Sequence, residues 1–167
     1  YGLSNEHHLS VVLQESLESK GYSIEVVNGS VSGSTSSGGL NRANWTLSEP
    51  GIDLMVLCLG ANDMLRGINP TETKNNLEKI IKIAHDNNIN VILAGIIAPT
   101  SHGYKYKKKF DKIFPDLAKK FKLKFIPFLL DGVAMRPEFN LSDGMHPNEK
   151  GIIIISNTLE EIILKNL

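Results

Sequence analysis

The chain has a single cysteine, no excess of charge of either sign and no long apolar run. Cys58 has no second cysteine to pair with, which excludes a disulfide framework inside the chain. The 18 Lys and Arg residues balance the 18 Asp and Glu residues, so the broad positive field that attracts nucleic acid or anionic membranes is missing. No segment reaches the roughly 18 consecutive apolar residues of a membrane-spanning helix. These absences exclude nucleic acid and an integral membrane segment, and leave a small molecule as the expected partner.

The 167 residues suit one ordinary domain, over residues 1–167, with a core large enough to be stable without metal or disulfide. Apolar residues at helical spacing predict helices over residues 6–20, 71–88, 104–121 and 148–165, and a short one near 40–47. Apolar runs of strand length predict strands over residues 22–28, 52–59, 90–97 and 123–128. Pro115 is expected to kink or split its helix. Cys58 is expected to be buried in its strand.

Strands and helices therefore alternate along the chain, and no repeat or linker divides it. This alternation predicts an α/β domain with a parallel sheet and helices on both faces. Functional groups in such folds gather in loops at the carboxyl ends of the strands. The loops after Asn28 and after Leu59, and the late segment "SDGMHP" (142–147), are therefore the places to look for a site.

"SDGMHP" holds an aspartate and a histidine three residues apart. If Asp143 accepts a hydrogen bond from one ring nitrogen of His146, the other nitrogen can take a proton from a nucleophile. Gly144 makes the turn between them easier. A metal site and a plain surface turn are the alternatives, and a metal fits poorly because no matching Cys and His cluster is present.

The two earlier loops offer groups that can stabilise negative charge. In "GSVSGST" (29–35), the small residue Gly33 can direct its N–H at a developing oxyanion. In "LGAND" (59–63), Asn62 presents a carboxamide donor, and Asp63 is expected to tie the loop to backbone N–H groups. A mobile turn and a simple turn-forming asparagine are the alternative interpretations.

The helix predicted over residues 104–121 carries a cluster of lysines, Lys105, Lys107, Lys108, Lys109 and Lys112. These side chains could meet an anionic head group, but a solvated helix face explains them more simply. His102, close to the end of a predicted strand, could border a pocket, and a surface position is the simpler interpretation.

Three motifs in order, "VNGSVSGSTSSGGLNR", "LGANDMLRG" and "DGMHPN", resemble the SGNH hydrolases, the GDSL family of esterases and lipases. The resemblance is greatest to the branch of bacterial thioesterase I, lysophospholipase L1 and arylesterase. It implies a flavodoxin-like three-layer α/β/α sandwich. It also implies that Gly33 and Asn62 are oxyanion-hole donors, and that Asp143 and His146 are the orienting acid and the general base.

The activity implied by this resemblance is hydrolysis of acyl esters or thioesters through an acyl-enzyme, with no metal or organic cofactor. The acyl group is expected near Met64, Leu65, Ile97 and Pro99. The chain departs from the usual motifs at Ser34, where relatives carry aspartate, and at Met64, which is larger than the usual residue. A carbohydrate acetylesterase on the same fold, or a non-catalytic flavodoxin-like binding module if the serine is absent, are the alternatives.

The family's first block, Gly-Asp-Ser-Leu, has no counterpart in the chain, whose residues Tyr1 to Ser4 match the tail of a segment that follows it. We therefore expect the nucleophilic serine before Tyr1, on an N-terminal segment that also supplies the first strand, bound covalently or non-covalently. Without that strand, its neighbours would keep unpaired backbone groups. Relatives of this branch are often exported, which favours a periplasmic or secreted location over a cytoplasmic one.

Overall fold

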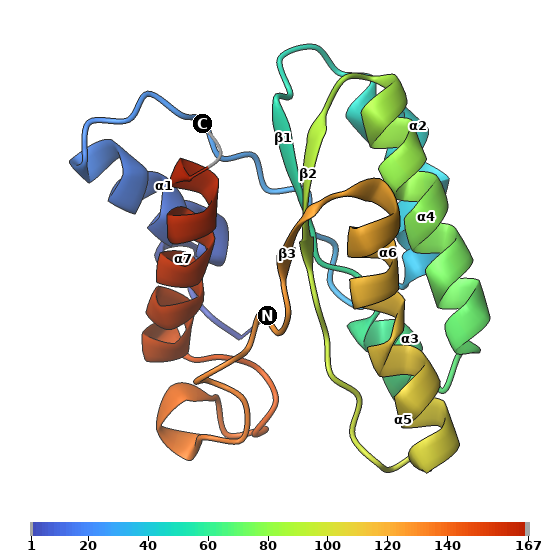
Figure 1. Ribbon diagram of the computed structural model, residues 1–167. Helices are drawn as coiled ribbons and strands as arrows, with labels where there is room; N and C mark the ends of the chain where they lie inside the picture. The colour runs from blue at the N-terminus through green and yellow to red at the C-terminus, as the bar shows by residue number, and fades with distance from the viewer. Residues whose placement is uncertain (1, 166–167) are drawn as a thin grey trace. The chain divides into compact units, whose positions relative to one another are not determined.

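The computed structural model describes residues 2–165 (Figure 1). The chain forms two compact units: unit 1 combines Tyr1–Gly29 with Leu129–Leu167, and unit 2 is the continuous segment Ser30–Phe128. Tyr1, the first of the residues matched to the tail of the segment that follows the family's first block, lies outside the described residues.

Unit 2 is built on a parallel sheet with the strand order β1-β2-β3. The strands are β1 (Leu54–Leu57), β2 (Asn90–Ala94) and β3 (Lys124–Ile126). Leu54 pairs with Asn90, and Ile92 pairs with Lys124. Within residues 2–165, β1 is paired along one edge only, the edge that faces β2. The predicted strands at 52–59, 90–97 and 123–128 are thus confirmed, each in a shorter form.

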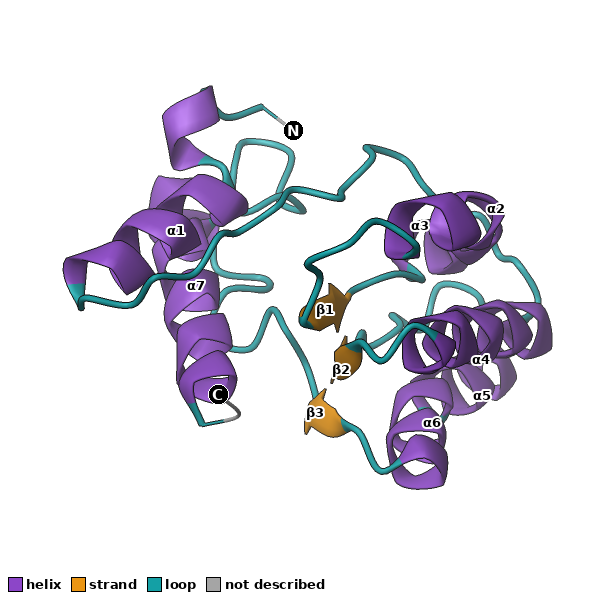
Figure 2. Ribbon diagram, turned by 90° about the horizontal axis from the view of Figure 1, so that it is seen from above, coloured by secondary structure: helices purple, strands orange, loops and turns teal. Residues whose placement is uncertain are grey.

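Five helices of unit 2 accompany the sheet: α2 (Ser36–Leu47), α3 (Ala61–Leu65), α4 (Pro70–Asp86), α5 (Tyr104–Asp111) and α6 (Ile113–Phe121). Figure 2 shows α2, α4 and α6 on the same side of the three strands. The buried face of α4 carries Leu77, Ile80, Ile81 and Ala84, the residues whose spacing predicts that helix. They join Phe110 and Phe114, together with Val91 and Leu93 of β2, in one core. Burial of each large apolar side chain contributes about 1.5–3 kcal/mol.

Local capping explains where two of these helices begin. The Thr35 Oγ1 accepts a hydrogen bond from the Gly38 N–H (3.2 Å), so α2 starts at Ser36, before the predicted start near residue 40. The Asn69 side chain accepts from the Thr71 N–H (3.0 Å), and Pro70 occupies the first helical position of α4.

The segment around Pro115 is split into two helices, as the sequence predicts. The break falls at Lys112, and Pro115 becomes the third residue of α6. Proline is tolerated there because the first N–H groups of a helix have no acceptor inside it. The α6 helix ends at Lys122, which adopts a left-handed conformation with φ of 54°.

Unit 1 holds α1 (Leu9–Ser19), α7 (Glu149–Leu164) and the short 3-10 helices η1 (Asn5–His7) and η2 (Pro137–Phe139). Helices α1 and α7 lie side by side, as both views show (Figures 1 and 2). Their buried apolar side chains are Leu13 and Leu17 on α1, and Ile152, Ile155, Leu159 and Ile163 on α7. The predicted helices over 6–20 and 148–165 are therefore confirmed.

The prediction of a strand over residues 22–28 is wrong. This segment has no strand in the structure, and Val27 is 77% exposed. Instead, the Gln14 carboxamide of α1 donates to the Ile24 carbonyl (2.7 Å) and accepts from the Val26 N–H (2.5 Å). A strand needs a neighbour to pair with, and an apolar run does not reveal whether that neighbour is present.

The prediction that Cys58 is buried is also wrong, because this residue is exposed. Side chains alternate between the two faces of an extended segment, so Cys58 points away from the side on which its neighbour Leu57 is buried.

Candidate active site

In unit 1, Asp143 and His146 are in direct contact. The Asp143 Oδ2 lies 2.6 Å from the His146 Nδ1, and Asp143 Oδ1 accepts hydrogen bonds from the backbone N–H groups of Met145 (2.9 Å) and His146 (3.0 Å). An ionised carboxylate can only accept, so Nδ1 carries the hydrogen in this contact. Nε2 is then the basic nitrogen of the neutral ring.

The turn that holds this pair is fixed at its base. The Leu141 N–H donates to the His146 carbonyl (2.7 Å), and Gly144 adopts a φ of +68°, which favours glycine. The buried Asn140 side chain, just before the turn, donates to the carbonyls of Val133 and Arg136, each at 2.7 Å.

The start of α7 is bonded to the same segment. The Asn148 side chain caps α7 by accepting from the Gly151 N–H, and it also donates to the Asn140 carbonyl. These bonds tie the turn to the start of α7.

The charge of Asp143 is strongly favoured by this arrangement. The backbone N–H groups of His146 and Met145, followed by the His146 side chain, lower the pKa of Asp143 to about 2. Hydrogen bonds to a carboxylate stabilise its charged form, so Asp143 is ionised above pH 3. A permanent negative charge beside Nδ1 stabilises the imidazolium that forms when Nε2 takes a proton.

In unit 2, the two predicted oxyanion donors are linked to one loop. Gly33 has a φ of +73°, and its carbonyl accepts a hydrogen bond from Arg66 Nη2 (3.0 Å). The Asn62 amide donates to the Ser34 carbonyl (3.1 Å). An amide nitrogen carries two hydrogens, so this bond orients Asn62 while its second N–H stays a donor.

Asp63 lies beneath this loop and ties it to the backbone, the role that the sequence indicates for it. Its carboxylate is 1% exposed and accepts from the Ser36 N–H (2.7 Å), the Ser36 hydroxyl (2.5 Å) and the Thr73 hydroxyl (3.0 Å). Sequence reasoning missed Ser36 and Arg66, because their partners lie 27 and 33 residues away.

The four residues predicted near the acyl group all lie in unit 2. Met64 is partly buried and packs against the core, whereas Leu65 and Ile97 are 54% and 47% exposed, and Pro99 is exposed as well. Exposed apolar side chains of this size can cover an apolar ligand.

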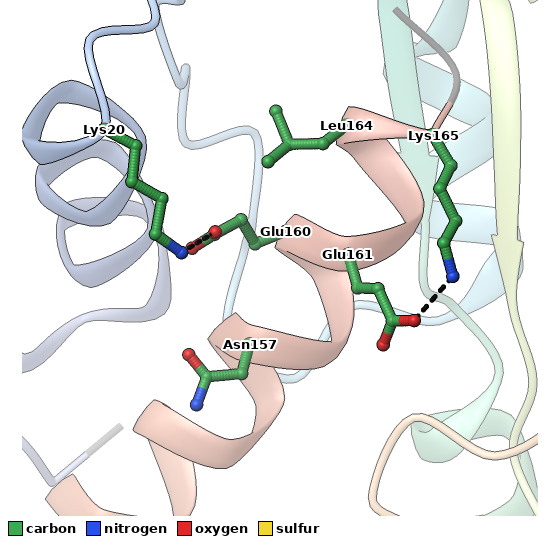
Figure 3. Close-up of a pocket in the computed structure, with 6 residues that line it drawn as sticks. All are labelled: Lys20, Asn157, Glu160, Glu161, Leu164 and Lys165. Carbon is green, nitrogen blue, oxygen red and sulfur yellow. Dashed lines mark hydrogen bonds and ion pairs between the residues drawn. The ribbon is translucent and has the colours of Figure 1, made fainter.

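Two of the hollows in the described part of the chain are large enough to consider as sites. One, of about 410 Å³, is lined by Gly67, Asn69, Pro70, His102, Lys105, Tyr106 and Lys109, so His102 does border a pocket. The other, of about 440 Å³, lies on α7 and next to Lys20 (Figure 3). Its charges are already paired, Glu160 with Lys20 and Glu161 with Lys165, as the dashed lines in Figure 3 mark. This second hollow therefore offers no unpaired charge to a ligand.

Comparison with known proteins decides the family. A model described as the GDSL-like Lipase/Acylhydrolase family matches residues 1–152. The chain belongs to this family. It is 34% identical over 167 residues to an arylesterase of Vibrio mimicus, covering 100% of this chain and 84% of that protein. It is 34% identical over 148 residues to thioesterase 1/protease 1/lysophospholipase L1 of Escherichia coli K12, covering 89% of this chain and 70% of that protein.

The fold class of this GDSL hydrolase is confirmed by a solved structure. The crystal structure of TesA matches with a TM-score of 0.93 and 32% sequence identity, over 99% of this chain and 92% of TesA. The fold is that of the SGNH hydrolases, the three-layer α/β/α class that the sequence predicts, and the activity is that of a carboxylic ester hydrolase.

No helix within residues 2–165 has the length and apolar character needed to cross a membrane. No group of three or more His, Cys, Asp or Glu side chains in the same residues could hold a metal ion.

Proposed function

We propose that Asp143 and His146 are the orienting acid and general base of this hydrolase, and that Gly33 and Asn62 are its oxyanion donors. The observation that carries the proposal is the 2.6 Å contact between Asp143 Oδ2 and His146 Nδ1. The three motifs that resemble the family lie in the sequence order expected of a single SGNH hydrolase domain.

The proposed reaction begins when His146 Nε2 takes the proton of a serine hydroxyl. The serine oxygen attacks the acyl carbonyl, whose oxygen becomes negatively charged and is held by the Gly33 N–H and the second N–H of Asn62. His146 then gives its proton to the leaving alcohol or thiol as the acyl-enzyme forms. A water molecule repeats the same steps and releases the acid.

The serine in this proposal lies upstream of Tyr1, on the segment that carries the family's first block. We propose the same segment as the source of the first strand. In the loop around Asn62, the Ser36 hydroxyl is already engaged, because it donates to the buried carboxylate of Asp63.

The proposed substrate is an acyl ester or thioester of the kinds named for the relatives. Leu65 and Ile97 expose apolar surface that could contact an acyl chain, and Met64 packs against the core of unit 2. A carbohydrate acetylesterase needs polar contacts for a sugar, and these four apolar residues do not supply them.

A fluorophosphonate probe tests the reaction class in the native protein. Such a probe reacts with a serine only where a general base activates it. We expect one phosphonyl group per native protein, found by intact mass, and little labelling of His146→Ala. Equal labelling of the wild type and His146→Ala would contradict the role of His146, and absence of labelling would contradict the serine mechanism.

Asn62→Ala tests the oxyanion role separately. Loss of one such donor slows the chemical step by about 10²- to 10³-fold. We expect that loss in kcat with a circular dichroism spectrum like that of the wild type. A folded Asn62→Ala protein with unchanged kcat would exclude Asn62 from the oxyanion hole.

A further inference from the structure

A carboxylate is buried in unit 2 without a cationic partner. Asp63 is 1% exposed, and no Lys or Arg side chain pairs with it in the described part of the chain. Its charge is compensated instead by three donors, the Ser36 N–H and the hydroxyls of Ser36 and Thr73. Replacing this carboxylate should cost folding free energy, because the buried donors would lose the oxygens that accept their hydrogen bonds.

The contacts of Asp63 close a ring that includes both candidate oxyanion donors. Asp63 follows Asn62 directly in α3, and it holds Ser36 at the first position of α2. Two residues before Ser36, the Ser34 carbonyl accepts from the Asn62 amide, and Gly33 precedes Ser34. The loop that carries Gly33 and the helix that carries Asn62 are thus joined at two points.

The ring is anchored to the core through α4. Thr73 is fully buried and donates to Asp63 Oδ1, and the Asn76 amide donates to the Ser36 hydroxyl (3.0 Å). One turn further along α4, Leu77 and Ile81 are fully buried in the core of unit 2. The position of the loop is therefore set by a rigid helix as well as by its own turn.

We propose that Asp63 is a positioning residue, which holds the Gly33 loop and the Asn62 amide in the relative position that oxyanion stabilisation requires. This inference rests on the proposed function of Gly33 and Asn62. Two carboxylate oxygens can accept from both the N–H and the hydroxyl of Ser36 as well as from Thr73. An amide at position 63 has a single acceptor oxygen, so it cannot accept from all three donors.

Asp63→Asn is the first test, in the native enzyme. Small displacements of a catalytic group slow a reaction by up to about 100-fold, so we expect kcat to fall by roughly 10- to 100-fold while KM changes little. Amide hydrogen exchange of residues 33–36 should become faster. Unchanged kcat per folded molecule would overturn the proposal.

A matched pair at Thr73 keeps the proposal falsifiable if Asp63→Asn does not fold. Thr73→Val keeps the shape and removes the hydroxyl that donates to Asp63, whereas Thr73→Ser keeps the hydroxyl. We expect Thr73→Val to lose clearly more kcat than Thr73→Ser. Equal losses would mean that Asp63 contributes packing alone. Ile81→Val, on the same helix but outside the ring, should lower Tm and leave kcat unchanged.

A double-mutant cycle with Asn62→Ala separates this inference from the proposed function. If Asp63 acts through Asn62, Asp63→Asn should cost much less in the Asn62→Ala background than in the wild type. An equal cost in both backgrounds would overturn the positioning role. If Asn62→Ala alone left kcat unchanged, the oxyanion role itself would be wrong, and the positioning role with it.

Discussion

The Asp143 carboxylate accepts hydrogen bonds from three donors within its own turn. These bonds keep it ionised and hold it against the His146 ring, as its proposed role of orienting acid requires. Asp143→Asn keeps the size of the side chain but replaces an acceptor of the Nδ1 proton by a group that favours the other tautomer of His146. We expect kcat to fall by about 10³- to 10⁴-fold, with little change in Tm. Steady-state kinetics and thermal melting check this.

The pH dependence follows from the low pKa of Asp143. Because its pKa is lowered to about 2 from an ordinary value of 3.8, the stability that its charge contributes is present above pH 3.8 and is lost only as the pH falls toward 2. Protonation of Asp143 should therefore not reduce activity between pH 4 and pH 7, which a pH profile of kcat checks. Asp131→Asn, at an exposed carboxylate that accepts from the Gly132 N–H, is the matched control and should leave kcat unchanged.

Gly33 has room for a side chain, but its backbone conformation disfavours any residue other than glycine. A Cβ added there would meet only Arg66 Nη2 at 3.8 Å, but the φ of +73° strains any L side chain. Gly33→Ala should cost about 1 kcal/mol of folding free energy and reduce kcat about 10-fold or more as the loop shifts.

Gly21→Ala is the control for this substitution. Gly21 has a φ of +83° and nothing within 4 Å of an added Cβ, and it lies just after α1. Urea unfolding should show a similar loss of stability in both variants, with kcat changed only in Gly33→Ala. A similar loss of kcat in both would mean that the effect at Gly33 is general destabilisation.

Between elements, one glutamate joins two helices of unit 2. Glu78 of α4 contacts Lys120 of α6 (2.8 Å) and Lys82 of its own helix (2.9 Å). Lys120, followed by Lys82, lowers the pKa of Glu78 to about 2 from 4.5. The stabilisation is therefore complete above pH 4.5 and disappears as the pH falls toward 2.

Glu78→Gln removes this ion pair with little change in shape. We expect it to lower the free energy of unfolding by about 1 kcal/mol or less at pH 7, because the pair is partly exposed. The difference from the wild type should shrink in 1 M salt and vanish near pH 2. Urea titrations at the two pH values check this, and a difference that persisted at pH 2 would contradict it.

For the whole molecule, the net charge of zero limits long-range attraction of substrates. An uncharged acyl ester should therefore reach the enzyme at a rate that depends weakly on salt, and kcat/KM should change by less than about twofold between 50 and 500 mM NaCl. A steep fall with salt would contradict this expectation and would indicate a local field, for which the lysines of α5 are the candidates.

Much of this protein follows from the sequence, because the deciding interactions are local. The apolar spacing of residues 71–88 predicts α4. Asp143 and His146 meet because the two residues between them, Gly144 and Met145, form a tight turn. The motif resemblance also identifies the family, since it depends on residue order alone.

Only the tertiary structure decided the features that depend on neighbours distant in the sequence. Residues 22–28 have strand composition but no strand, and Gln14 binds their backbone instead. The partners of Asp63 lie on α2 and α4, and Arg66 reaches the Gly33 carbonyl across 33 residues. A sequence shows which groups can donate and accept, whereas folding determines which of them meet, because burial and pairing depend on all the elements that pack around them.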